Sequence, residues 1–338
     1  MAVRFGVLVP QGWHLDLQDI PDPVQQFEAM VRVGVEAEKL GYDSIWVYDH
    51  FHTVPTAELA TNFECWIATT ALARATSRVR VGQLVTCNSY RPPSLLAKMA
   101  STVDVLSHGR LDFGIGAGWY EEEYVAYGYP YPDGPERLRM LAEALQIFKA
   151  MWTEPYATFE GRYYRIKGAI NEPKGVQKPH PPIWIGGGGE KVTLKLVAKY
   201  GDACNIGGIN PDVYRHKFDV LRQHCEAVGR DYSTIIKSAE VFTHLVLPGQ
   251  TPEEATAKAR RDVSRLVGHE VSLEEFRQGN FRGYPQGFIG TPAQAIEAFG
   301  RLIEAGVEYF IVYLNNVVHL HTLRAFAEEV MPAFKSRP

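Results

Sequence analysis

Short apolar segments of strand length alternate with amphipathic helical segments along the whole chain, and this alternation limits the possible folds more than any other feature. Residues 3–9 and 44–48 are two such strands, separated by a helical pattern at 23–40 that ends at Gly41. The same pattern predicts further strands at 79–85, 111–116, 182–185, 202–206, 235–247 and 308–313, and helices at 63–76, 93–106, 135–152, 189–200, 210–228, 291–305 and 319–333.

Eight strand and helix couplets imply parallel strands joined by right-handed crossovers, either in a closed barrel or in a long doubly wound sheet. The count favours an α/β fold of the (β/α)8 TIM-barrel type. A chain of 338 residues is long enough for such a barrel of roughly 250 residues with insertions. We therefore expect a single domain over residues 1–338, with its active site in the loops that follow the strands.

Two intervals, at about 153–181 and 248–290, are too long for simple connections. We expect them at the carboxyl-terminal face of the barrel strands, as lids or substrate walls. The alternating stretch at 157–166 predicts a hairpin that turns at Glu160 and Gly161. The second interval predicts helices at 252–267 and 272–278, followed by a turn-rich segment at 279–287.

Charge and cysteine content narrow the class of partner. Lysine and arginine total 35 against 39 acidic residues, so the net charge of −4 provides no basic field for nucleic acid or a membrane surface. There is no run of 18 apolar residues, and the chain begins with a strand pattern, so we expect a cytoplasmic protein with a small-molecule substrate. The four cysteines form no C-x-x-C pair, which predicts reduced thiols.

Glycines alternate at the end of the predicted strand at 111–116. Gly114, Gly116 and Gly118 lack a Cβ, so a flat or charged ligand can approach the main chain there. The spacing is a weak dinucleotide signal, because Trp119 occupies the position of the third glycine in the G-x-G-x-x-G fingerprint. A glycine-rich strand end without a ligand is the alternative.

Asp49 and His50 follow the second predicted strand, where a barrel presents its catalytic groups. A histidine beside a carboxylate can donate or accept a proton near neutral pH. The structural alternative is an aspartate that caps a turn and a histidine that fills a polar gap. His50 and His52 also form an H-x-H pair, but the last predicted strand ends in residues 313–316 without an acid, so we predict no metal site.

Two further loops follow predicted strands. Cys87 and Asn88 come after the third strand and can line a flat ligand; no base lies near Cys87 in the sequence, which favours a lining role over a nucleophile. Arg91, before two prolines, can simply fix the entry of the next helix. Four glycines at 186–189 open the helix predicted at 189–200, and exposed amides at a helix start predict a phosphate cradle.

Together and in this order, these motifs resemble the bacterial luciferase-like monooxygenase superfamily, and more closely its branch that uses the 8-hydroxy-5-deazaflavin coenzyme F420. The resemblance covers nearly the whole chain. It implies a TIM barrel with the flavin or deazaflavin ring across the barrel mouth and the coenzyme phosphate on the loop at Gly188 and Gly189. The motifs that carry it lie at 49–51, 84–93, 114–120, 159–164, 181–189 and 202–205.

The resemblance also implies roles for single residues. His50 matches the acid/base beside the ring carbon that exchanges the hydride, and a non-prolyl cis peptide is expected near Leu84 and Val85. Trp119 stands where the family's sugar-phosphate dehydrogenases have a glutamate, which argues against sugar-phosphate oxidation and for an aromatic substrate wall, although Glu121, Glu122 and Glu123 lie close by. The cofactor-binding set we predict is Asp49, Cys87, Asn88, Ala117, Gly118, Glu122, Gly187, Gly188, Gly189 and Glu190.

The function we expect is an oxidoreductase that moves a hydride between coenzyme F420 and a small organic substrate. The coenzyme would carry the hydride, and the protein would supply placement and one proton. An FMN-dependent two-component monooxygenase, served by a separate flavin reductase, is the alternative. A non-catalytic flavin-binding protein is a third interpretation, against which the pair of Asp49 and His50 argues. We also expect a homodimer.

Overall fold

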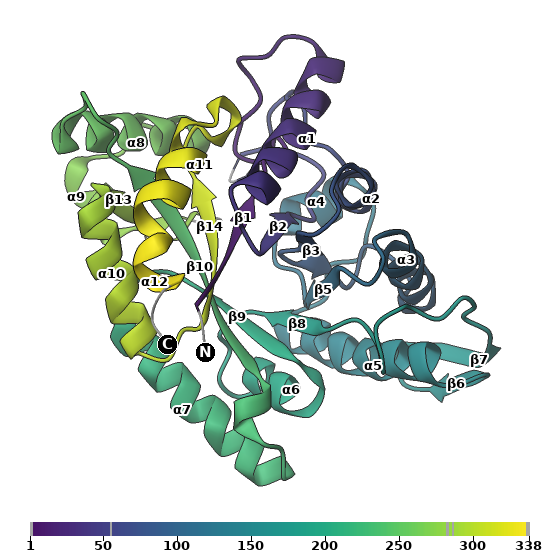
Figure 1. The fold of residues 1–338 in the computed structure, drawn as a ribbon. Helices are drawn as coiled ribbons and strands as arrows, with labels where there is room; N and C mark the ends of the chain where they lie inside the picture. The colour runs from purple at the N-terminus through teal and green to yellow at the C-terminus, as the bar shows by residue number, and fades with distance from the viewer. Residues whose placement is uncertain (1–2, 55, 282–283, 286, 336–338) are drawn as a thin grey trace.

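The computed structural model describes residues 3–54, 56–281, 284–285 and 287–335, and its centre is a closed barrel of eight parallel strands (Figure 1). The first strand pairs with both the second and the last, which closes the barrel. The predicted TIM-barrel fold is confirmed. The barrel strands are β1 (Arg4–Leu8), β2 (Ser44–Val47), β3 (Arg80–Gln83), β5 (Leu111–Gly116), β8 (Ile183–Gly186), β9 (Ala203–Gly207), β10 (Ile236–Leu245) and β14 (Tyr309–Leu314).

Helices surround the barrel and cover its outer face (Figure 1). Many of them begin where a polar cap is followed by proline, as at Asp22 with Pro23 and Thr291 with Pro292; the cap side chain accepts a hydrogen bond from a free backbone amide of the first turn. The helices between barrel strands are α1 (Pro23–Lys39), α2 (Cys65–Ala75), α3 (Pro93–Leu106), α5 (Gly134–Thr153), α6 (Thr193–Tyr200), α7 (Pro211–Val228) and α10 (Pro292–Glu304).

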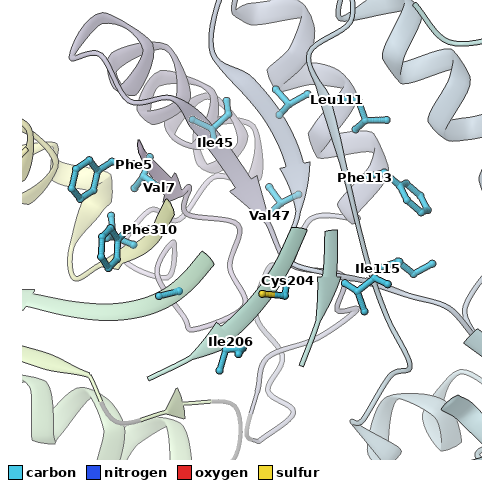
Figure 2. Close-up of a cluster of buried hydrophobic side chains, with 14 of the residues drawn as sticks. Phe5, Val7, Ile45, Val47, Leu111, Phe113, Ile115, Cys204, Ile206 and Phe310 are labelled. Carbon is cyan, nitrogen blue, oxygen red and sulfur yellow. The ribbon is translucent and has the colours of Figure 1, made fainter. Parts of the chain in front are cut away.

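Alternate strand residues point outward and form the main hydrophobic core between strands and helices. Phe5 and Val7 on β1 belong to this layer, and so does Phe310 on β14, whose ring stacks on Phe5 with centroids 5.5 Å apart (Figure 2). Because side chains alternate along a strand, the residues between them point into the barrel. The sequence pattern thus fixes which side chains can reach a site at the barrel mouth.

Large aromatic residues fill the lower part of the barrel interior. Trp46, Trp184 and Tyr309 are at most 1% exposed and pack edge to face. Gly6 and Gly82 make room for them, because a Cβ at Gly82 would lie 2.4 Å from the Trp46 ring. The barrel is therefore a packed core below and hollow only towards the carboxyl ends of its strands.

Several elements differ from the sequence-based expectation. The third strand is interrupted after Gln83 by a cis peptide between Leu84 and Val85, as the family resemblance implied, and resumes as β4 (Thr86–Cys87). A short helix that the sequence analysis missed, α4 (Glu121–Ala126), follows β5. The closing helix predicted at 319–333 is instead divided into η2 (Val317–His319), α11 (His321–Ala325), the π-helical segment η3 (Phe326–Val330) and α12 (Pro332–Lys335).

The first insertion contains the predicted hairpin, with strands β6 (Ala157–Glu160) and β7 (Arg165–Ala169). Glu143 of α5 accepts hydrogen bonds from the backbone amides of its turn, and Figure 1 draws the hairpin beside α5. The segment joins the end of α5 to the amino end of β8, so its position differs from the expected one at the opposite face. Its tip still reaches the loop after β4, where Asn88 donates a hydrogen bond to the Tyr164 hydroxyl.

The second insertion follows the carboxyl end of β10, as expected. Val263 and Val271 of this segment are buried against Leu15 and Phe242, so the insertion forms one wall of the barrel mouth. The expected turn at 279–287 lies partly outside the described residues, which omit 282–283 and 286. The elements of this insertion are α8 (Pro252–Val267), α9 (Leu273–Gln278), β11 (Asn280–Phe281), β12 (Tyr284–Pro285) and β13 (Phe288–Gly290), and β13 pairs with β10.

The described helices were also compared with the length and hydropathy of a membrane span. None of them is long and apolar enough to cross a bilayer.

Candidate active site

A cavity of about 440 Å³ opens at the carboxyl ends of the barrel strands. This is the end where TIM barrels carry their active sites. Six of the residues predicted for the site line this cavity, namely Asp49, His50, Cys87, Ala117, Gly118 and Gly187. Gly189 and Glu190 line an adjoining hollow, and Asn88, Glu122 and Gly188 line neither of the two.

His50 is held by a buried glutamate. Its Nδ1 lies 2.7 Å from Oε2 of Glu123, a residue of α4 that is 0% exposed. Burial alone would raise the pKa of Glu123, but hydrogen bonds from His50, Tyr90 and the Phe51 amide lower the pKa below its usual value. An ionised Glu123 accepts a hydrogen bond from Nδ1–H of His50. The other ring nitrogen, Nε2, is then the atom that can exchange a proton with a ligand.

The same glutamate ties two loops together. Glu123 accepts hydrogen bonds of 2.7 Å from the Tyr90 hydroxyl and from the Phe51 amide. On the other side of His50, the Trp13 indole stacks on the imidazole with centroids 4.6 Å apart and planes 8° apart. The His50 ring is thereby fixed in orientation from its edge and from its face. In the sequence, Glu123 was marked only as one of three glutamates close to Trp119. Its neighbour Glu122 is exposed.

Asp49 is part of a buried ion-pair network. Nη1 and Nη2 of Arg91 donate to its carboxylate at 2.8 and 3.0 Å, and the Cys87 amide donates at 2.8 Å. Arg91 precedes α3 and also pairs with Glu64. Burial disfavours the charged guanidinium, yet the Asp49 carboxylate keeps the pKa of Arg91 above its usual value. Asp49 thus fixes the loops after β2 and β4 against each other at the cavity edge.

Cys87 and Gly118 face each other where the glycine-rich strand ends. The Cys87 thiol lies 3.0 Å from the Tyr124 hydroxyl, and burial raises its pKa to about 12. The thiol therefore stays protonated, as expected for a lining residue rather than a nucleophile. Gly118 has a φ of 80°, and a Cβ there would lie 2.0 Å from the Tyr124 hydroxyl oxygen. Only glycine fits at this point.

The four-glycine loop does not open a helix directly, which corrects the helix predicted at 189–200. Gly186 ends β8, and α6 begins at Thr193 after an irregular segment. Gly187 has a φ of 111°, which favours glycine, whereas a Cβ at Gly188 would meet its neighbours at 3.6 Å or more, an ordinary contact distance. Val192, the residue before the helix, has φ −124° and ψ −54°, outside the usual helical values, so the helix starts only at Thr193.

Basic side chains that the sequence analysis did not select lie beside this loop. Lys217 of α7 forms an ion pair with Glu190, and Lys191 and Lys217 line the hollow next to Gly189. A hydrogen bond from Lys217 is the main cause that lowers the pKa of the exposed Glu190. The predicted phosphate loop is therefore accompanied by the positive charge of a lysine from a different element. Lys217 lies about thirty residues after the loop in the sequence, so a search for a local motif does not find it.

The cavity is lined by a second carboxylate in addition to that of Asp49. Glu240 of β10 accepts a hydrogen bond of 2.7 Å from the Tyr48 hydroxyl. Burial raises its pKa to about 7, and the hydrogen bond from Tyr48 opposes this only in part. Trp13, Trp119 and Phe242 also line the cavity, so Trp119 does form part of an aromatic wall. Among the described residues, no three His, Cys, Asp or Glu side chains are grouped so as to hold a metal ion.

A barrel of this topology with a buried histidine and glutamate pair at its mouth defines a TIM-barrel protein with a small-molecule site. The chain belongs to the luciferase-like monooxygenase family, whose model matches residues 3–309.

Similar proteins fall into two coenzyme groups. An F420-dependent glucose-6-phosphate dehydrogenase of Microbacterium testaceum is 26% identical over 90% of this chain and 92% of its own length. An FMNH(2)-dependent dimethylsulfone monooxygenase of Pseudomonas putida is 26% identical over 78% of this chain and 76% of its own. The solved structure of an F420-dependent secondary alcohol dehydrogenase with an F420-acetone adduct has a TM-score of 0.80 at 21% identity, covering 99% of this chain and 100% of that one.

Proposed function

We propose that this protein is an oxidoreductase that transfers a hydride between coenzyme F420 and a small organic substrate. The observation that carries the proposal is one cavity that combines a glycine-lined edge with the His50 and Glu123 pair. The relatives named as F420-dependent enzymes support this choice of coenzyme. In this proposal residues 1–338 act as one domain.

The residues present fit a flat ring with an anionic tail. A Cβ at Gly116 or Gly186 would lie 2.8 Å from the Val85 side chain, so these glycines leave room for Val85, which lines the cavity with Leu84 and offers an apolar surface to a planar group. Lys191 and Lys217, next to the glycine loop, would bind the negative charges of the coenzyme tail. The predicted roles of Gly188 and Gly189 at the phosphate stay proposals of the same kind.

When bound, F420 supplies the ring carbon that accepts or gives up the hydride. His50 holds or moves the accompanying proton at Nε2, because Nδ1 is occupied by Glu123. Asp49 and Arg91 keep the loops after β2 and β4 in place, and the aromatic residues that line the cavity exclude water. Each contribution comes from a side chain whose position is fixed by at least one partner.

An FMN-dependent monooxygenase is the second candidate, favoured by the Pseudomonas putida relative. It would use the same cavity and would need a reductase as partner.

The expected homodimer also stays a prediction. The four thiols, which form no disulfide in the structure, support a reducing compartment such as the cytoplasm.

Titration with F420 and with FMN, followed by anaerobic reduction of each complex, tests the proposal. We expect micromolar or tighter binding of F420, tighter than that of FMN, and hydride exchange without oxygen. If FMN bound equally well or better, and product formed only with oxygen, the monooxygenase function would replace the one proposed.

A further inference from the structure

Glu240 is the one carboxylate of strand β10, whose sequence is IKSAEVFTHL. Its neighbours Ala239 and Val241 pack in the outer core, so Glu240 lies on the inner face of β10 with Ser238 and Phe242. Ser238 is engaged with Asn205 deeper in the barrel. Glu240 is therefore the carboxylate that β10 presents to the cavity.

The hydrogen bonds of Glu240 are incomplete. Tyr48 donates to Oε1, whereas Oε2 forms no hydrogen bond with any residue that the structure describes. Within those residues no lysine, arginine or histidine forms an ion pair with it either. Among the described residues, the ionisable groups that interact with it are Tyr48, directly after β2, and Tyr214 of α7. A half-buried carboxyl with spare hydrogen-bonding capacity in the wall of a cavity is suited to bind a ligand.

The contacts of Trp13 set Glu240 apart from the reacting end of the cavity. One face of the indole stacks on His50, and the same ring packs on Tyr48 with centroids 3.8 Å apart. Tyr48 in turn reaches Glu240 through its hydroxyl. Two aromatic rings therefore separate Glu240 from His50 along this wall, so the two groups serve different atoms of one substrate.

The charge of the cavity wall limits what can bind. Among the described residues that line it, none is lysine or arginine, and the Asp49 carboxylate is already paired with Arg91. An anionic substrate would meet Glu240 without a compensating cation, at an electrostatic cost that grows in a buried site. An uncharged substrate avoids this cost.

We propose that Glu240, held by Tyr48, binds an uncharged hydroxyl or carbonyl group of the substrate at a point remote from the reacting carbon, and so determines substrate specificity. A carboxylate accepts a hydrogen bond from a hydroxyl, and the protonated acid donates one to a carbonyl oxygen. With a pKa raised to about 7, Glu240 has both forms available near neutral pH. Only the assignment of the reacting end to His50 rests on the function proposed above.

Binding measurements on four ring compounds test this inference: cyclohexanol, cyclohexane-1,4-diol, cyclohexylamine and cyclohexanecarboxylate. Isothermal titration compares the wild type with Glu240→Leu, with Glu240→Gln, and with the control Glu226→Gln, which changes an exposed glutamate of α7. We expect the wild type and the control to bind the diol roughly 10- to 100-fold more tightly than cyclohexanol, the range of one charge-assisted hydrogen bond. Glu240→Leu should abolish that preference, and Glu240→Gln should keep part of it.

Three results would overturn the inference: equal binding of diol and cyclohexanol by the wild type, an unchanged preference in Glu240→Leu, or tightest binding of the amine or the carboxylate. If Glu240→Leu does not fold, Glu240→Gln decides, since a preference equal to that of the wild type at every pH would exclude a role for the ionisable group. F420 affinity is measured separately on the same samples. Failure to bind F420, with a diol preference that depends on Glu240, would refute the proposed function and leave this inference standing.

Discussion

Glu123, which is buried, and Glu240, which is half-buried, are both glutamates at the barrel mouth, but their surroundings have opposite effects. Glu123 accepts hydrogen bonds from His50, Tyr90 and backbone amides, and its pKa is lowered. Glu240 has a single donor, Tyr48, and its pKa is raised to about 7. Burial acts in the same direction on both, so the number of donors decides which form is stable.

The comparison separates two kinds of carboxylate by what they do for the fold. Glu123 is a support whose charge is needed to hold loops and a histidine. Glu240 is a strained point, because folding must keep a poorly solvated carboxyl there with one partner. Supports of the first kind orient chemistry, and groups of the second kind remain available to a ligand.

The largest effect is expected from removing the partner of Glu123. If His50 moves the proton of the hydride step, His50→Ala should lower kcat by roughly 10²- to 10⁴-fold, with F420 affinity changed far less. His269→Ala is the control, since His269 is exposed and does not line the cavity. Steady-state kinetics and melting temperature check it: a kcat within a few-fold of wild type, with lower thermal stability, would make His50 a structural residue.

Removing the support itself should mainly lower stability. Glu123→Ala leaves the Tyr90 hydroxyl and the Phe51 amide without their acceptor, so we expect the free energy of unfolding to fall by about 3 kcal/mol. Because the pKa of Glu123 is lowered in the folded state, its contribution is present above the ordinary carboxyl pKa and is lost on acidification. Urea unfolding against pH measures this. Glu122→Ala, at the exposed neighbour, should change stability by less than about 0.5 kcal/mol; equal losses in both variants would contradict the contrast.

Glu240 should show the opposite pH dependence. Its pKa rises from 4.5 to about 7 on folding, so its contribution to stability is full below pH 4.5 and is lost as the pH rises through about 7. Glu240→Gln removes this loss, and should therefore be more stable than wild type by about 3 kcal/mol at about pH 8, with little difference at about pH 4.5. Unfolding curves of both proteins at the two pH values provide the measurement. Burial also raises the pKa of Asp16, to about 6, but this contribution is common to both proteins and cancels in the difference. A difference independent of pH would mean that Glu240 does not titrate.

Most of the fold could be predicted because strands and helices alternate regularly along the chain, and because the hydrophobic pattern of a strand repeats at a different period from that of a helix. The interruption between β3 and β4 follows from no local propensity and was expected only through the family resemblance. The delayed start of α6 was missed because a run of glycines allows many backbone conformations and does not indicate which one is adopted. The first insertion was placed at the wrong face although the predicted order of elements, a helix at 135–152 followed by a strand at 182–185, already puts residues 153–181 at the amino end of a strand.

The candidate site was predicted where the motif and the strand end coincide, as at His50 and Cys87. It was incomplete where partners come from different elements, as with Arg91 for Asp49 or Lys217 for Glu190. Glu123 was missed because three glutamates in a row are equivalent in sequence, and only the turn of α4 points one of them inward. Glu240 did leave a signal, since a lone carboxylate on the inward face of a barrel strand is costly without a role.

The packed aromatic residues beneath the cavity have a consequence for the order of events. Trp46, Trp184 and Tyr309 close the barrel from below, so ligands enter and leave by way of the loops above. Two molecules that share a cavity closed from below can hinder each other's exchange. The molecule that lies deeper has to bind first and leave last. The geometry of the barrel thus favours an ordered sequence of binding and release for coenzyme and substrate.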